Sequence, residues 1–157
     1  MLSPLFSFAL IAFGLPVQEN DIEPFPGFKY HQIKAYNFNA KHGIPECSMP
    51  LREDGTLCSS VKGRGKRLSK TQAKTLFAIL NNPTSYKRPR ARCFTPHHAF
   101  VFFDRKGKAV GQISLCFECD RLFVEPARPE SRSLAPPGMK KLRSLCHNLG
   151  LKDCDER

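Results

Sequence analysis

The chain has 157 residues, of which 41% are hydrophobic and 13 are prolines. This length suits one domain and leaves little room for a second core, and the apolar content excludes general disorder. A formal charge of +11 and a pI near 9.6 indicate attraction to polyanions such as nucleic acid, anionic lipid head groups or acidic glycans, without indicating specificity for any of them.

The amino-terminal residues are typical of an export signal. Residues 5–15 (LFSFALIAFGL) form an uninterrupted apolar run that ends before Pro16, and no Lys or Arg precedes it. A membrane-spanning helix needs about 20 apolar residues, whereas a run of this length suits the core of a signal peptide. Ala12 and Gly14 supply the small residues that precede a cleavage site. We therefore expect a signal peptide over 1–14 and an exported protein, periplasmic or secreted; a cytoplasmic protein is the alternative if the run is retained and folded.

The next segments are expected to be a linker and two short strands. Residues 15–27 combine acidic residues with prolines, as linkers do. Residues 28–38 (FKYHQIKAYNF) place aromatic and β-branched residues in rough alternation, which predicts a strand. Residues 56–61 follow an Asp-Gly turn signal and are a second strand candidate. The stretch 62–67 (KGRGKR) is expected to be a flexible basic loop.

Two helices are well indicated. Ser69 and Gln72 form a capping box at the start of a helix over 70–80, whose apolar residues fall on one face. A second helix is predicted over 137–149, because proline suits its first turn and Gly150 suits the position after its last turn.

A hairpin is the best-defined element. Apolar runs over 98–103 and 109–116 flank a four-residue turn that ends in Gly107. If Asp104 pairs with Gly107 across that turn, Thr95 faces Cys116, unless a one-residue bulge shifts the register. The elements together predict one basic, cysteine-containing α+β domain over 28–157, in which a small antiparallel sheet centred on the hairpin at about 98–116 packs with helices at about 70–80 and 137–149.

The hairpin also brings together potential ligands. On the expected register Cys93 lies near Cys116 and Cys119, and His97 and His98 lie one or two residue pairs further in. Three interpretations stay open. Cys93 joins Cys116 or Cys119 in a structural disulfide, which suits an exported protein. Alternatively, the three cysteines and one histidine bind zinc. Finally, the C-x-x-C sequence is a dithiol redox centre, although the adjacent acidic residues would raise its thiol pKa.

The same residues carry a family resemblance. The motif C-x-x-P-x-H at 93–98, the sequence FFD at 102–104, Gly107 and the sequence ISLCFEC at 113–119 resemble the core of a family of small uncharacterised bacterial proteins. The pattern extends to 68–80 and 138–154, so that it covers roughly half of the chain. The resemblance supports the predicted architecture and the importance of the cluster, and it implies no activity.

The remaining cysteines are expected to be structural. The chain has seven cysteines, an odd number, and this density points to disulfides in an exported protein. Cys146 and Cys154 are expected to form a local disulfide or to be two core thiols. Cys47 with Cys58 would close a loop around 50–55.

Basic residues are concentrated in the region 61–92, which contains no Asp or Glu. They are Lys62, Arg64, Lys66, Arg67, Lys70, Lys74, Lys87, Arg88, Arg90 and Arg92. This region is either a solvated face or a surface for a polyanion or an acidic protein.

No Gly-x-Ser-x-Gly, HExxH, P-loop or dinucleotide motif is present, so no catalytic residue is proposed. The sequence predicts an exported, non-enzymatic binding or structural domain that contacts an acidic partner through the region 61–92, with no transmembrane span. A zinc-binding module or thiol redox protein that uses the Cys93, His97, His98, Cys116 and Cys119 cluster is the alternative, and a cytosolic nucleic-acid-binding protein is the third hypothesis.

Overall fold

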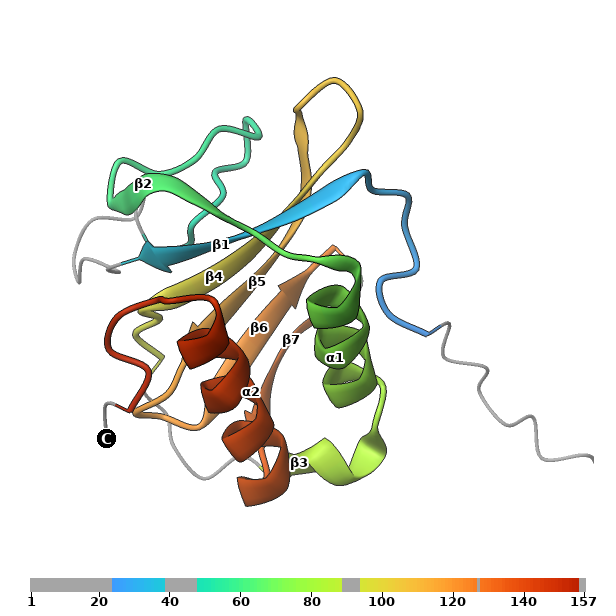
Figure 1. Ribbon diagram of the computed structural model, residues 1–157, viewed down its shortest axis with the longest axis vertical. Helices are drawn as coiled ribbons and strands as arrows, with labels where there is room; N and C mark the ends of the chain where they lie inside the picture. The colour runs from blue at the N-terminus through green and yellow to red at the C-terminus, as the bar shows by residue number, and fades with distance from the viewer. Residues whose placement is uncertain (1–23, 39–47, 89–93, 127, 156–157) are drawn as a thin grey trace, which may run out of the picture.

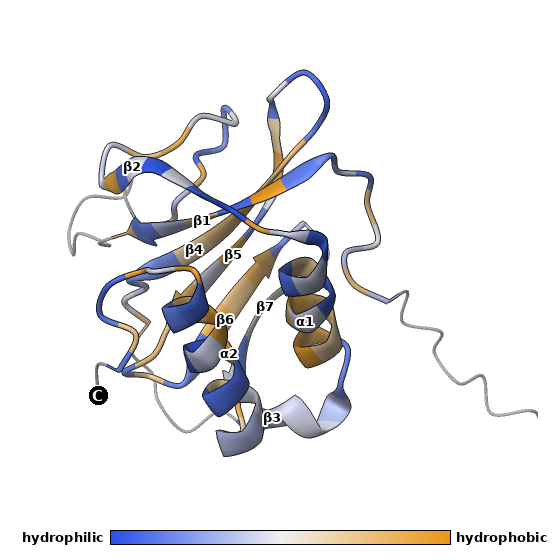
Figure 2. Ribbon diagram, in the orientation of Figure 1, coloured by the Kyte–Doolittle hydropathy of each residue, from blue (hydrophilic) through white to orange (hydrophobic). Residues whose placement is uncertain are grey.

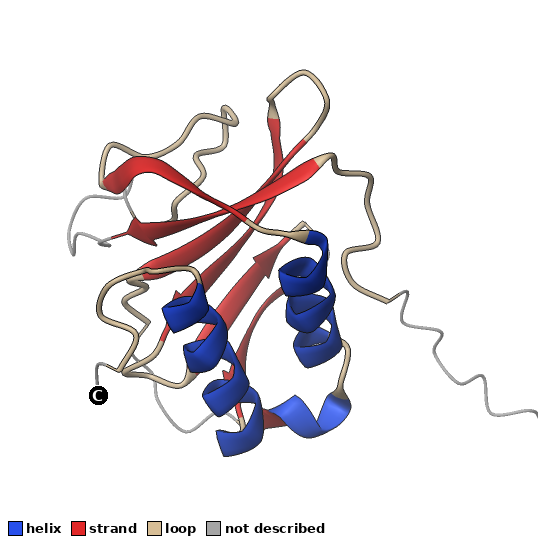
Figure 3. Ribbon diagram, viewed as in Figure 1, coloured by secondary structure: helices blue, strands red, loops and turns tan. Residues whose placement is uncertain are grey.

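The computed structural model describes residues 24–38, 48–88, 94–126 and 128–155, so the expected signal peptide lies outside the described residues. One seven-stranded antiparallel sheet, with strand order β2-β1-β4-β5-β6-β7-β3, carries two helices on one face (Figures 1 and 3). The predicted α+β class, with a sheet centred on the hairpin and two packed helices, is confirmed.

The described chain forms the following elements in order. They are β1 (Gln32–Phe38), β2 (Val61–Arg67), α1 (Lys70–Leu80), the 3₁₀ helix η2 (Pro83–Ser85), β3 (Tyr86–Lys87), β4 (His98–Phe103), β5 (Ala109–Cys116), β6 (Arg121–Glu125), β7 (Arg128–Leu134) and α2 (Pro136–Asn148).

Both helices lie where the sequence predicts them. The capping box of α1 is formed, since the Gln72 amide donates to Ser69 Oγ over 3.2 Å and the Ser69 amide donates to Gln72 Oε1 over 2.8 Å. Helix α2 begins at Pro136, one residue earlier than expected, because the fixed φ of proline suits the first turn. Gly150 follows α2 with a φ of 64°, which favours glycine at this position.

The main core lies between the sheet and the two helices. Strands β1, β4, β5 and β6 present a hydrophobic face toward α1 and α2 (Figure 2). Phe102 is 0% exposed, and the rings of Phe25, Phe28, Tyr30 and Phe77 surround it at centroid distances of 5.3–6.4 Å. Phe25 falls within the segment expected to be a linker, yet it is 4% exposed. The folded domain therefore includes Phe25.

On the opposite face of the sheet, residues 48–60 cover part of the surface. Leu51 and Leu57 pack on Tyr36, Val101 and Phe103. The buried Gln112 side chain holds this segment against the sheet, because its Oε1 accepts a hydrogen bond from the Leu51 amide over 2.8 Å. Since β4 and β5 are covered on both faces, their sequences are continuous apolar runs rather than alternating ones.

The predicted hairpin is confirmed over the expected residues, but its expected register is wrong. The Asp104 carbonyl accepts from the Gly107 amide within the turn, but the Asp104 amide donates to the Lys108 carbonyl, so the turn closes one residue later than expected and His98 faces Leu115. Two features cause this difference. Asp104 Oδ1 accepts from the amides of Lys106 and Lys108 and thereby closes a longer turn, and the strands contain a bulge between Phe102 and Phe103.

The position of β2 differs from the expected strand and loop in two respects. The residues 62–67, expected to be a flexible loop, form most of β2, whereas 56–60 contain no strand. β2 is a terminal strand of the sheet and pairs with β1 alone among the described strands. Its side chains are largely exposed, so it lacks the apolar alternation by which a buried strand is recognised.

Two glycines of β2 provide a test of how this strand is held. Gly63 and Gly65 both have a φ of 72°, but only Gly65 touches Tyr36, whose ring would lie 2.5 Å from an added Cβ. Gly63→Ala is expected to lower the free energy of unfolding by about 1 kcal/mol, the cost of the left-handed conformation. Gly65→Ala is expected to cost about 2 kcal/mol because Tyr36 must also shift. Urea denaturation measures both, and equal costs would show that the Tyr36 contact does not hold β2.

Candidate functional site

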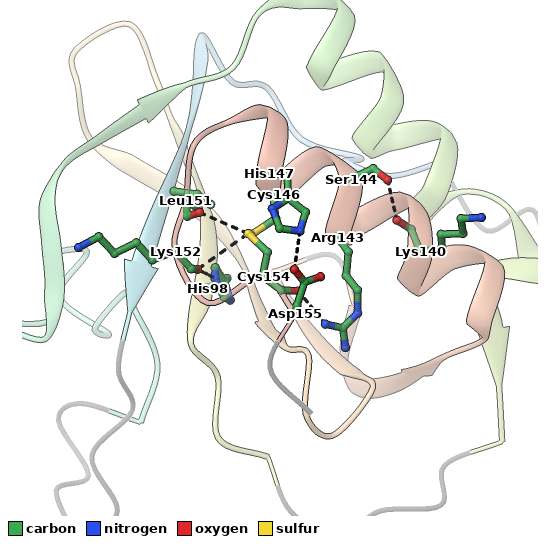
Figure 4. A network of polar contacts seen from close by, with 10 residues as sticks. All are labelled: His98, Lys140, Arg143, Ser144, Cys146, His147, Leu151, Lys152, Cys154 and Asp155. Carbon is green, nitrogen blue, oxygen red and sulfur yellow. Dashed lines mark hydrogen bonds and ion pairs between the residues drawn. A yellow bond between two sulfur atoms is a disulfide. The ribbon is translucent and has the colours of Figure 1, made fainter.

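Cys146 and Cys154 form a disulfide at the carboxyl-terminal end of the domain. Cys146 lies on the buried face of α2 and Cys154 lies beyond it; the sulfurs are 1.95 Å apart and the Cα atoms 5.9 Å apart (Figure 4). Each residue is 2% exposed. The predicted local disulfide is confirmed.

His98 lies beside this disulfide. Its ring is 1% exposed and lies 4.9 Å from the Phe117 ring. His98 Nε2 is 2.6 Å from the Lys152 carbonyl oxygen, and because a carbonyl only accepts, Nε2 carries the proton. The ligand atoms of His98, Cys146 and Cys154 lie within 4.8 Å of one another. The buried imidazole and the two sulfurs are therefore close neighbours beneath the end of α2.

Hydrogen bonds tie the residues after α2 to the sheet. Asn37 on β1 donates from Nδ2 to the Lys152 carbonyl over 3.0 Å and accepts at Oδ1 from the Lys152 amide over 3.2 Å. Arg143 on α2 donates to the Cys154 carbonyl over 2.7 Å and to the Phe117 carbonyl over 3.2 Å. These contacts join Lys152 and Cys154 to the rest of the fold in addition to the disulfide (Figure 4 shows the Arg143 side).

A surface ion pair flanks the same segment. His147 Nε2 lies 3.0 Å from Asp155 Oδ2, and the two side chains are 52% and 74% exposed. A pair this exposed to solvent adds little stability. His147 is adjacent to Cys146 in sequence but lies on the solvent side of α2, so it contrasts with the buried His98.

The C-x-x-C sequence forms a tight turn at the end of β5. Cys116 and Cys119 are both buried thiols, and the Cys119 amide donates to Cys116 Sγ over 3.2 Å. This N–H···S contact fixes the position of the Cys116 sulfur. Cys93, the third cysteine of the predicted cluster, lies outside the described residues, so the complete cluster stays a prediction.

The structure divides the described members of that cluster between the two faces of the sheet. His98 alternates with Phe100 and Phe102 on the helix-covered face, where it joins Cys146 and Cys154. Alternation along β4 and β5 places His97 and Cys116 on the opposite face. His98 therefore lies with Cys146 and Cys154, and the predicted site of Cys93, Cys116 and Cys119 with either His97 or His98 stays a prediction.

Sequence reasoning did not bring His98 together with Cys146 and Cys154. The signal was present, since His98 shares the strand face of Phe100 and Cys146 shares the helix face of Leu142. Both faces are buried in the structure. What the sequence lacked was the packing position of α2 over β4, which depends on the whole sheet.

The basic region 61–92 is divided between two edges of the sheet. At the β2 edge, the side chains of Lys62, Arg64, Lys66 and Arg67 are exposed, and Lys70 and Lys74 follow on α1. Lys87 lies on β3 at the other end of the sheet, where its Nζ pairs with Asp120 Oδ2 at 2.7 Å. Arg88 follows it and is exposed, whereas Arg90 and Arg92 lie outside the described residues. We call the first six residues the basic edge.

A groove with several polar residues in its lining lies next to the basic edge. It has a volume of about 510 Å³ and lies between α1 and α2. Its lining includes Thr71 and Thr75 from α1 and Lys140, Lys141 and Ser144 from α2, and none of the residues that line it is acidic. The groove begins at the first turn of α1, directly after β2, so it extends the positive surface across the helices.

Comparison with known proteins adds no family. No family model, no curated protein and no solved structure matches this chain. Among the described residues, none of the helices is both long enough and apolar enough to cross a membrane.

Proposed function

We propose that the protein is an exported, non-enzymatic binding domain that holds an extended anionic polymer along its basic edge. The observation that carries this proposal is the row of exposed cations at 62, 64, 66 and 67 on β2, which continues at 70 and 74 on α1. Gly63 and Gly65 separate three of these cations, so no bulky or acidic side chain lies among them. A polymer backbone can therefore approach the strand closely.

The groove between α1 and α2 supports the same function. Lys140 and Lys141 supply two further cations, and Thr71, Thr75 and Ser144 supply hydroxyl groups. Lysine gives charge attraction, whereas hydroxyl groups give the hydrogen bonds that anionic glycans and nucleic acids accept. The competing explanation is protection of an edge strand, because lysines on an edge strand prevent its pairing with other chains.

Removal of charge from β2 separates these explanations. The triple variant Lys62→Gln/Arg64→Gln/Lys66→Gln is expected to bind heparin and single-stranded DNA about tenfold or more weakly at low salt. The slope of log affinity against log salt concentration is expected to fall by the amount that about two to three phosphate contacts contribute. Equilibrium titration at several salt concentrations measures both quantities.

The matched control removes three charges from the β4–β5 turn. Arg105→Gln, Lys106→Gln and Lys108→Gln change the net charge equally, but these residues lie at the tip of the hairpin. Their loss is expected to change affinity much less. Equal weakening by the two triple variants would show attraction to net charge alone, and unchanged binding in the β2 variant would leave edge protection as the role of the basic edge.

The second candidate function is zinc binding or thiol redox chemistry at the C-x-x-C turn. The favouring observation is the Cys119 amide that donates to Cys116 Sγ, since backbone donors to sulfur orient a thiolate ligand. Cys93 and His97 would complete that site. Metal analysis of protein purified without chelator tests it: one zinc per chain, lost in Cys116→Ser, is the expected result for a zinc module, and absence of any transition metal contradicts it.

A further inference from the structure

We propose that His98, Cys146 and Cys154 form a buried copper(I) site that is closed while the disulfide is intact and becomes available when a dithiol reductant opens it. The site shares no ligand with the basic edge or with the C-x-x-C turn, although the Phe117 ring of that turn lies 4.9 Å from the His98 ring. It combines one strand residue with two residues that bracket the end of α2 (Figure 4).

The donor set defines the class of ion. Reduction converts a disulfide, which is a poor ligand, into two thiols, and their thiolates together with an imidazole are soft donors. Thiolate-rich sites favour Cu(I) and Zn²⁺. A structural Zn²⁺ site takes four ligands, whereas this group supplies three within 4.8 Å and is closed to solvent. The three-ligand set therefore favours Cu(I).

One ring nitrogen of the histidine already makes a supporting hydrogen bond. Because Nε2 donates to the Lys152 carbonyl, a neutral His98 ring carries its lone pair on Nδ1. Metal-binding histidines usually donate their second nitrogen to a carbonyl or carboxylate in this way, which fixes the tautomer and the ring orientation. The carbonyl is itself held by the Asn37 side chain. His98 thus has its supporting hydrogen bonds before any ion arrives.

Reduction would leave both sulfurs close to the imidazole. Arg143 holds the Cys154 carbonyl and Asn37 holds Lys152, so the segment after α2 keeps these attachments when the covalent bond is broken. The sulfurs must then separate to about 4 Å, the distance between two thiolates that each lie about 2.3 Å from one ion in trigonal geometry. Rotation of the two side chains supplies that movement.

The reaction balances with a dithiol as reductant. The dithiol gives two electrons and two protons to the disulfide and becomes a disulfide itself, while Cys146 and Cys154 become thiols. Binding of Cu(I) then displaces the two thiol protons to solvent.

The experiment measures Cu(I) binding to the full chain under anaerobic conditions. Protein reduced by dithiothreitol, then freed of it, is titrated with Cu(I) against a chromophoric Cu(I) chelator. Reduced wild-type protein is expected to hold one more ion than reduced His98→Gln, and one more than reduced Cys146→Ala/Cys154→Ala. His147→Gln, which removes the exposed neighbouring histidine, is the matched control and is expected to hold as many ions as wild type. Equal stoichiometry in His98→Gln and wild type overturns the proposal.

A second measurement needs no variant and keeps the proposal testable if His98→Gln does not fold. Mass mapping follows alkylation of Cys146 and Cys154 in the reduced wild-type protein with and without one equivalent of Cu(I). The ion is expected to slow alkylation of both cysteines together by at least about tenfold, since bound thiolates are withheld from the reagent. Unchanged alkylation, a disulfide that dithiothreitol does not open in the folded protein, or equal protection by Zn²⁺ would each overturn the copper(I) assignment.

Discussion

Replacement of Phe102 by alanine is expected to lower the free energy of unfolding by about 3–5 kcal/mol. Phe102 is 0% exposed and lies among four aromatic rings, three of which belong to the chain before β1 and one to α1. Its removal both loses buried apolar area and leaves a cavity, because rings held by two separate segments cannot collapse together to fill it. Urea denaturation followed by circular dichroism measures the change.

Phe103→Ala is the control for that prediction. Phe103 is adjacent in sequence but packs on the opposite face, in the smaller cluster with Tyr36, Val101 and Ala109. It is 8% exposed, so its loss should cost less. If Phe103→Ala proved as costly as Phe102→Ala, the aromatic cluster beneath α1 would not be the centre of the core.

Removal of the disulfide is expected to lower the free energy of unfolding by about 3 kcal/mol. Cys146 and Cys154 are separated by 8 residues, and closing a loop of this size in the unfolded chain accounts for most of that value. The variant is Cys146→Ala/Cys154→Ala, which avoids placing hydroxyl groups in the core. Denaturation in urea measures the stability, and hydrogen exchange should show that protection is lost first after α2.

The hydrogen bonds of Arg143 and Asn37 set a limit on this effect. They are expected to keep the segment after α2 in place in the folded variant, so secondary structure should remain unchanged at room temperature. An unfolding midpoint equal to that of the wild type would show that these hydrogen bonds, rather than the disulfide, secure the segment.

Local sequence signals predicted the elements whose cause is local. Ser69 and Gln72 specify the start of α1 by their own hydrogen bonds, and the apolar runs of β4 and β5 mark strands that are buried on both faces. The strands β3, β6 and β7 were not predicted. β3 has two residues, and its pairing with β7 comes from the packing of η2 and α2 rather than from its own sequence.

The basic edge and the histidine site show why function was harder to predict. The sequence KGRGKR has the composition of a loop, and only pairing with β1 makes it a strand. The position of His98 beside Cys154 depends on a fold that joins residues 56 apart. Charge could be counted from the sequence, but its division between the β2 edge and the β3 edge required the strand order.

The pairing of Asn37 with Lys152 has a consequence for biosynthesis. These residues are 115 positions apart, and they join the first strand to the last described turns of the chain. A growing polypeptide cannot make this contact, or bring Cys154 to Cys146, until synthesis has reached the end of the domain. Oxidation of that cysteine pair therefore requires a chain that extends at least to Cys154, and a chain cut short before Lys152 leaves Cys146 without this partner.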